Sequence, residues 1–143
     1  MRIESIVLAE GLGQDSRGAL TAIGLSQNVY IAESLPATTK RAVVVHMTEC
    51  AEGESLAFTF TVKDPSGKVN SAQSGEVRLG KALFRDLPVG ADLPVETAIT
   101  FTSMGTYTIG IEVRQSDGTT HNASVPLHVV EPAARRTLEE LAV

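Results

Sequence analysis

The chain has 143 residues, of which 43% are apolar and 20% charged, so its composition is that of one globular domain and argues against disorder. Its 17 acidic residues outnumber the 12 basic ones, and the net charge of −5 argues against attraction to nucleic acid or an anionic membrane. No apolar run is long enough for a signal peptide or a membrane span, and Cys50 is the only cysteine, so we expect a cytoplasmic protein.

The N-terminal residues predict a first strand and a tight connection. Residues 2–9 form a nearly continuous apolar run, which is typical of a strand covered on both faces. Residues 11–13, Gly-Leu-Gly, predict a glycine-rich turn, because no helix follows whose N-terminus could hold a phosphate. Residues 14–18 predict the first tight connection between strands.

Residues 19–32 fit two interpretations. They form either one strand interrupted near Gly24 or a hairpin around Ser26 and Gln27, and the sequence does not choose between these. Residues 41–48 follow as a second apolar run, which again suits a central strand.

The rest of the chain alternates apolar and polar side chains in residues 54–63, 93–102, 105–115 and 119–130. Successive strand side chains point to opposite faces, so each segment has one buried face and one exposed face. The side chains expected in one contiguous core are Phe58, Phe60, Ile99, Phe101, Tyr107, Ile109, Ile111, Val125 and Leu127.

Turn signals lie where these strands stop. Residues 64–67, Asp-Pro-Ser-Gly, predict a type I turn, and residues 116–118, Ser-Asp-Gly, predict a hairpin between the last two strands. Pro126 has no N–H for a ladder and predicts an edge position. About seven to nine short strands at this spacing predict an all-β, immunoglobulin-like antiparallel β-sandwich over residues 1–131.

Residues 132–143 are expected to be a separate helical segment or tail. Pro132 suits a first helical position, and Ala134, Leu138, Leu141 and Ala142 would share one face of the helix. A helix of about eleven residues is marginal alone in water. We therefore expect the segment to dock by its apolar stripe or to be disordered, and we favour docking on a neighbouring chain.

Residues 105–109, Gly-Thr-Tyr-Thr-Ile, resemble the Gly-x-Tyr-x-Cys stretch that opens strand F of immunoglobulin-like domains. There the tyrosine hydroxyl bonds back to the preceding corner. Ile109 stands at the cysteine position and the chain has no tryptophan, so the resemblance implies a sandwich that is not of the antibody type.

A broader resemblance covers the chain up to Pro132. Residues 8–10 (Leu-Ala-Glu), residues 22–25 (Ala-Ile-Gly-Leu), the 64–67 turn and the final hairpin look like a bacterial family of uncharacterised small immunoglobulin-like β-sandwich proteins of unknown function. These motifs are turns and core residues. The resemblance therefore implies a fold and no activity.

No residue is predicted to be catalytic, cofactor-binding or metal-binding, and no cofactor is expected. His46, His121 and His128 have no second ligand at metal spacing, and we expect all three at the surface. There is no Gly-x-Ser-x-Gly elbow, and nothing places Cys50 directly beside a histidine in sequence. Cys50 is expected to be a small, at least half-buried residue.

Sugar and single-stranded nucleic acid sites usually need exposed aromatic rings, and the aromatic residues considered, Phe58, Phe60, Phe101 and Tyr107, fall on core faces. By elimination we expect a non-enzymatic protein-interaction or assembly module. It would bind another protein or itself, as a homo-oligomer through an edge strand or the C-terminal segment. The alternative is a small-molecule-binding β-sandwich or an enzyme with a loop-assembled site, which a deep pocket lined by convergent polar groups would favour.

Overall fold

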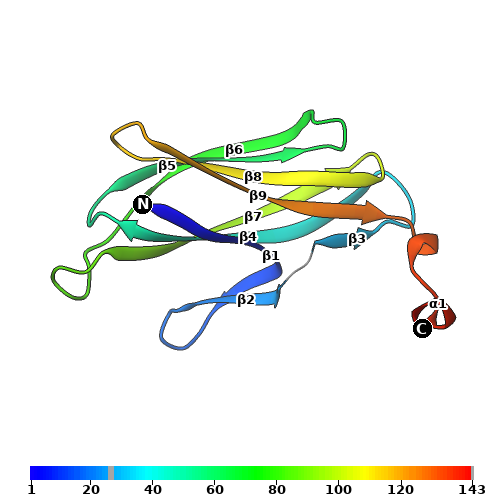
Figure 1. Ribbon diagram of the computed structural model, residues 1–143, viewed down its shortest axis with the longest axis horizontal. Helices are drawn as coiled ribbons and strands as arrows, with labels where there is room; N and C mark the ends of the chain where they lie inside the picture. Colours follow the sequence, from blue (N-terminus) through cyan, green and yellow to red (C-terminus); the bar gives the residue numbers. More distant parts are fainter. Residues whose placement is uncertain (26–27, 143) are drawn as a thin grey trace.

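A computed structural model describes residues 1–25 and 28–142, and Figure 1 shows how their strands are arranged. These residues form nine strands in two packed sheets, followed by a short helical segment, so the expected all-β sandwich is confirmed. The strands are β1 (Arg2–Gln14), β2 (Leu20–Leu25), β3 (Val29–Ile31), β4 (Ala37–Cys50), β5 (Ser55–Lys63), β6 (Val69–Arg78), β7 (Val89–Phe101), β8 (Gly105–Arg114) and β9 (Thr120–Val130).

Sheet A has the strand order β2-β1-β4-β7, and sheet B has the order β3-β9-β8-β5-β6. The pairs run antiparallel except β3 with β9, which run parallel. β3 pairs only with residues 128–130 of β9. Among the described strands, Pro126 therefore has a partner only on the β8 side, which confirms its expected edge position.

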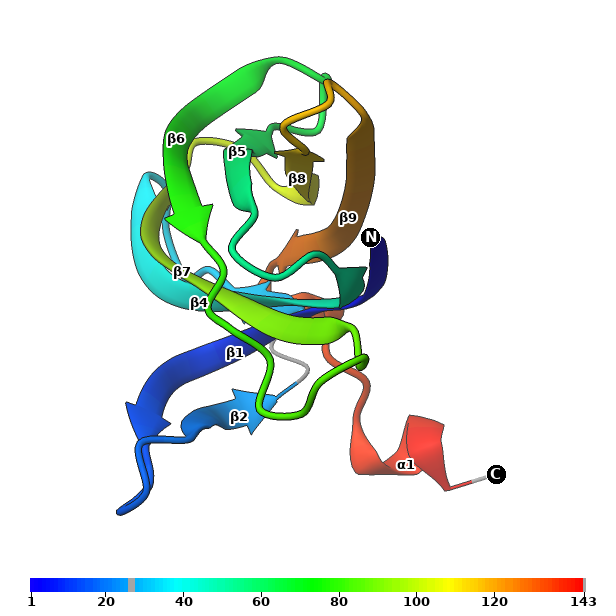
Figure 2. The same ribbon diagram turned by 90° about the vertical axis from the view of Figure 1, so that its left-hand side faces the viewer.

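β1 is longer than expected because it belongs to two pairings. Residues 2–9 pair with β4, and the strand then continues to Gln14 paired with β2. Gly11 and Gly13 lie within this second half, so the predicted glycine-rich turn is wrong, and the turn falls at residues 15–19. We call residues 10–25 the arm, a two-stranded ribbon that projects from the sandwich (Figures 1 and 2).

Neither interpretation of residues 19–32, one interrupted strand or a hairpin, agrees with the strand pairing. β2 pairs with β1 in sheet A, and β3 pairs with β9 in sheet B, so the chain crosses between the sheets and the two segments do not form a hairpin. Ser26 and Gln27 themselves lie outside the described residues. Gly24 adopts a left-handed φ of 66°, which agrees with the irregularity expected there.

Three hairpins turn through five-residue loops with the same backbone hydrogen bond, at residues 15–19, 64–68 and 115–119. In each loop the amide of the fourth residue donates to the carbonyl of the first, at 3.0, 2.9 and 3.0 Å respectively. That fourth residue is Gly18, Gly67 or Gly118, with φ of 81°, 87° and 89°, values that favour glycine. The tight connections expected from the sequence are therefore confirmed.

The core lies between the sheets, and seven of the nine side chains expected there are buried. Phe58 and Val125 are partly buried and pack against the same cluster. The Phe101 ring is fully buried against the rings of Tyr30 and Tyr107, with centroid distances of 5.1 and 5.0 Å. The Tyr107 hydroxyl donates to the carbonyl of Ser103 at 3.1 Å, so the corner bond implied by the resemblance is present.

The sequence analysis missed β6 and the extra lengths of β4 and β7. β6 has no apolar face, because all but two of its residues are exposed and it forms the edge of sheet B. β6 is held in the sheet by its antiparallel pairing with β5, to which the 64–68 loop connects it. Residues 37–40 extend β4 beyond the predicted limit because they pair with residues 98–101 of β7. Residues 89–92 extend β7 because they lie opposite residues 46–50 of β4.

The C-terminal segment is not one helix. A 3-10 turn, η1 (Pro132–Ala134), is followed by extended backbone at Arg135 and then by a single helical turn, α1 (Leu138–Leu141). A capping box formed by Thr137 and Glu140 begins α1. Leu138 and Leu141 are 86% and 63% exposed, so these two leucines do not dock on their own domain, and docking on another chain and disorder of the segment both stay predictions.

Candidate functional site

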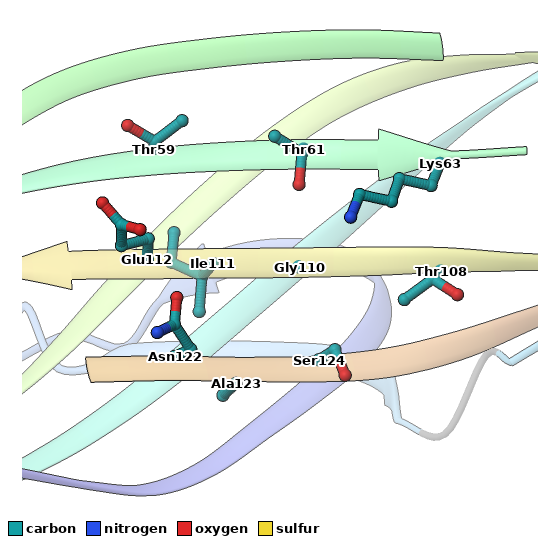
Figure 3. Close-up of a pocket in the computed structure, with 10 residues that line it drawn as sticks. All are labelled: Thr59, Thr61, Lys63, Thr108, Gly110, Ile111, Glu112, Asn122, Ala123 and Ser124. Carbon is teal, nitrogen blue, oxygen red and sulfur yellow. The ribbon is translucent and has the colours of Figure 1, made fainter. Parts of the chain in front are cut away.

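A polar groove lies on the outer face of sheet B. Figure 2 shows that the sheet curls, so that β6 and β9 rise on either side of β5 and β8. The groove has a volume of about 500 Å³. Its lining side chains come from β5 (Thr59, Thr61, Lys63), β8 (Thr108, Glu112) and β9 (Asn122, Ser124), with Gly110 in the middle (Figure 3).

Cross-strand register explains the shape of this groove. Gly110 pairs with Thr61 on one side and Ser124 on the other, and its missing side chain lowers the floor at the centre. In Figure 3 the Lys63 side chain extends from β5 toward β8, and the Glu112 carboxylate lies toward Thr59. The groove thus presents hydroxyls, one amide, one ammonium and one carboxylate.

These groups can form hydrogen bonds with a small polar molecule, but they do not define a reaction. Glu112 already forms an ion pair with Arg114 at 3.5 Å. The lining has no histidine or cysteine to act as a base or nucleophile, and no aromatic ring for stacking. No buried side-chain polar atom of the described residues lacks a hydrogen-bond partner, so no unsatisfied buried group among them points to a ligand in the groove.

A Ser-His-Asp row crosses the outer face of sheet A. Register places Ser5 of β1 beside His46 of β4, and His46 beside Asp92 of β7. His46 Nδ1 lies 2.7 Å from Asp92 Oδ1, as in the orienting pair of a catalytic triad. Sequence reasoning missed this row because its members are 41 and 46 positions apart, and only the strand register brings them together.

The row lacks the other requirements for nucleophilic catalysis. Within the described residues, no hydrogen bond joins the Ser5 hydroxyl to His46. The side chains of His46 and Asp92 are 45% and 47% exposed on an open sheet face, so water screens their interaction. A strand in mid-sheet also does not present the converging N–H donors that stabilise an oxyanion.

The remaining sequence candidates are structural. His121 Nε2 bonds to Gln115 Oε1 at 2.8 Å, and His128 Nδ1 bonds to Thr106 Oγ1 at 3.0 Å. The described part of the chain contains no group of three residues that could hold a metal ion. Cys50 is buried, as expected, and its burial raises the pKa of the thiol, which therefore stays protonated and unreactive at neutral pH.

Besides Leu138 and Leu141 of the C-terminal segment, large exposed apolar side chains cluster on three segments. In the loop of residues 79–88, Leu83 is 95% exposed and Phe84 is 68% exposed. Ile23 and Leu25 of the arm are more than half exposed, and the short β3 adds two further exposed aliphatic residues. Phe84 was not among the aromatic residues considered from the sequence, so its exposure was missed. Figure 1 places the 79–88 loop at the end of the molecule opposite α1.

Comparison with known proteins adds no identity. No known family model matches the sequence, and no curated protein matches it. The structure therefore defines the class of fold, a nine-stranded β-sandwich in the described residues. Within residues 1–25 and 28–142, no helix is long and apolar enough to span a membrane.

Proposed function

We propose that this protein is a non-enzymatic interaction module that binds another protein, or a second copy of itself, through the apolar side chains of the arm and of the 79–88 loop. The observation that supports this function is the exposure of two adjacent large residues, Leu83 and Phe84, at 95% and 68%. Burying such a side chain is favourable by roughly 1.5–3 kcal/mol. A partner that covered both would gain a large part of its binding free energy there.

The proposal includes the type of fold, an immunoglobulin-like sandwich. The Tyr107 corner at the start of β8 and the two packed sheets support an immunoglobulin-like sandwich. Domains of this architecture serve as scaffolds that present loops and edges. The exposed apolar loop and the projecting arm are features of that kind.

Site-specific photo-crosslinking tests this function. A photo-reactive phenylalanine analogue placed at Phe84 or Ile23, in the cells that make the protein, should give an adduct of one defined mass. The same analogue at Val69, which is 49% exposed on β6, should give none. The pair Leu83→Ser with Phe84→Ser should weaken the partner's affinity at least tenfold. Equal labelling at all three positions, or at none, would refute the proposal.

Small-molecule binding is a second candidate function, supported by the 500 Å³ polar groove of sheet B. A Gly110→Val variant tests it, because a Cβ there lies 3.4 Å from Thr61 Oγ1 and would fill the centre of the groove without a severe clash. If the groove binds a ligand, native mass spectrometry of the freshly purified protein should show a bound mass that this variant lacks. An identical mass for both proteins, equal to that of the bare chain, would count against this candidate.

The enzyme alternative has its own test at the Ser-His-Asp row. We expect a fluorophosphonate probe to leave Ser5 unmodified, since the hydroxyl has no bonded base and no oxyanion donors face it. Intact-mass analysis after overnight exposure measures this. Stoichiometric labelling that disappears in Ser5→Ala and His46→Ala would establish a nucleophile there and overturn the non-enzymatic assignment.

A further inference from the structure

The four edges of the two sheets differ in how well they are shielded from further pairing. An exposed edge strand offers unpaired N–H and C=O groups to any other strand, and proteins usually shield it with charges, proline or short length. In sheet A, the β7 edge carries Asp92, Pro94 and Glu96. It is also covered at one end, where the side-chain amide of Asn70 donates to the carbonyl of Thr100 at 2.8 Å.

Both edges of sheet B are shielded as well. β6 carries Glu76 and Arg78. At the other edge, β3 has only three residues, and Pro126 lies on the part of β9 that β3 leaves uncovered. Each of these strands therefore has at least one of the usual features that prevent edge-to-edge association.

β2, the second edge of sheet A, has none of these features among its described residues. Its sequence, Leu-Thr-Ala-Ile-Gly-Leu, contains no charged residue and no proline. A six-residue strand offers about 20 Å of backbone. Gly24, with its left-handed φ, limits the regular part to residues 20–23. Among the edge strands of more than three residues in the described part of the chain, β2 is the one with neither a charged residue nor a proline.

The face of the arm beside this edge is apolar. Ile23 and Leu25 are 56% and 57% exposed. Gly11 and Gly13 pair with Ile23 and Thr21, so β1 adds to this face only the methyl group of Ala9, which pairs with Leu25. A two-stranded ribbon is at best marginally stable in water, so further strands beside β2 would support the arm.

The charges on the edge strands are compatible with a second copy of this chain as the occupant of the β2 edge. A second copy of β2 would meet no like charge, because the strand has no ionisable group. Self-pairing of β7 would instead bring acidic residues of two copies together, which is unfavourable. A self-complementary, uncharged, apolar strand fits its own copy in the antiparallel direction, and a two-fold axis then closes the assembly as a dimer.

We propose that β2 pairs antiparallel with β2 of a second copy of this chain about a two-fold axis, joining the two A sheets into one continuous eight-stranded sheet. This inference rests on the proposed interaction function and names its partner. The exposed Ile23 and Leu25 of the two copies pack beside the new ladder.

The mass of the protein in solution tests the dimer. At tens of micromolar, light scattering after gel filtration should give twice the chain mass of 15.1 kDa for the wild type. Ile23→Lys, which adds an edge charge at an exposed position, should give 15.1 kDa, with an unchanged circular dichroism spectrum. The matched control Val69→Lys, at a similarly exposed apolar residue on β6, should remain dimeric.

Cysteine cross-linking tests the register. In a Cys50→Ala background, single cysteines at Thr21, Ile23 or Leu25 should form an intermolecular disulfide most rapidly at the position nearest the axis, and Val69→Cys should form none. A dimer that survives Ile23→Lys, or cross-links equally fast from β2 and β6, overturns the proposed pairing. A monomeric wild type also overturns it, and the photo-crosslinking outcome from Phe84 then decides separately whether the interaction function stands.

Discussion

Replacing Phe101 by alanine removes the ring that contacts both other rings of the aromatic cluster between the two sheets. The side chain is 0% exposed, and its ring packs against Tyr30 and, edge-to-face, against Tyr107. The substitution deletes a whole buried ring at a site where neighbouring strands are held by their ladders, so the cavity cannot collapse fully.

The expected cost of Phe101→Ala is roughly 3–5 kcal/mol in the free energy of unfolding. Of this, each lost ring pair accounts for about 0.5–1.5 kcal/mol. A domain of this size has a stability of about 5–15 kcal/mol, so the variant should fold but lose a large fraction of its stability. With about 2–4 °C for each kcal/mol, the melting temperature should fall by roughly 6–20 °C.

Urea unfolding followed by circular dichroism measures this cost, provided that the slope of the transition is unchanged. Phe84→Ala is the matched control, because that ring is 68% exposed and its loss should change stability by less than about 0.5 kcal/mol. Equal costs for the two variants, or no measurable cost at Phe101, would contradict the burial and packing described for β7.

Three further outcomes are expected. Tyr107→Phe removes the hydroxyl that bonds to the corner before β8 and should cost roughly 1–3 kcal/mol in the same urea assay. The Ser66 hydroxyl donates to the Asp64 carboxylate and holds the pKa of Asp64 below its usual value. The stabilisation of the folded state by this carboxylate is present above about pH 4 and is lost as the pH falls through the folded pKa. Asp64→Asn should therefore make the acid unfolding transition less steep. Cys50 should react with an aromatic disulfide reagent only when the protein is unfolded, since burial raises its pKa; stoichiometric reaction of the native protein at neutral pH would show that the thiol is accessible.

Strands with one buried face could be predicted from the sequence because burial leaves a period-two pattern. β5, β7, β8 and β9 show this pattern, and each was predicted to within a few residues at one or both ends. β6 left no such pattern because it is exposed on both faces. The arm was missed for a related reason, since Gly11 and Gly13 contribute no side chains to a pattern and are common in turns.

The candidate site could not be predicted because it depends on register between distant strands. The groove needs Gly110 to lie between Thr61 and Ser124, which no local spacing indicates. The pairing of His46 with Asp92 has the same origin. The exposure of Phe84 was missed because it lies in a loop, where apolar residues have no periodicity to separate buried from exposed positions.

The pairing of β4 with β7 has a consequence for how the chain folds as it is made. Ala37 pairs with Phe101, 64 positions later, whereas the three hairpins close through loops of five residues. At about 5–20 residues per second, β4 waits roughly 3–10 s on the ribosome before β7 is complete. During that interval β4 is paired with β1 on one side, and its other edge, which β7 later covers, is open. Nascent chains on the same messenger RNA are therefore most prone to aggregate through β4, whose Val43 and Val45 are buried in the folded protein.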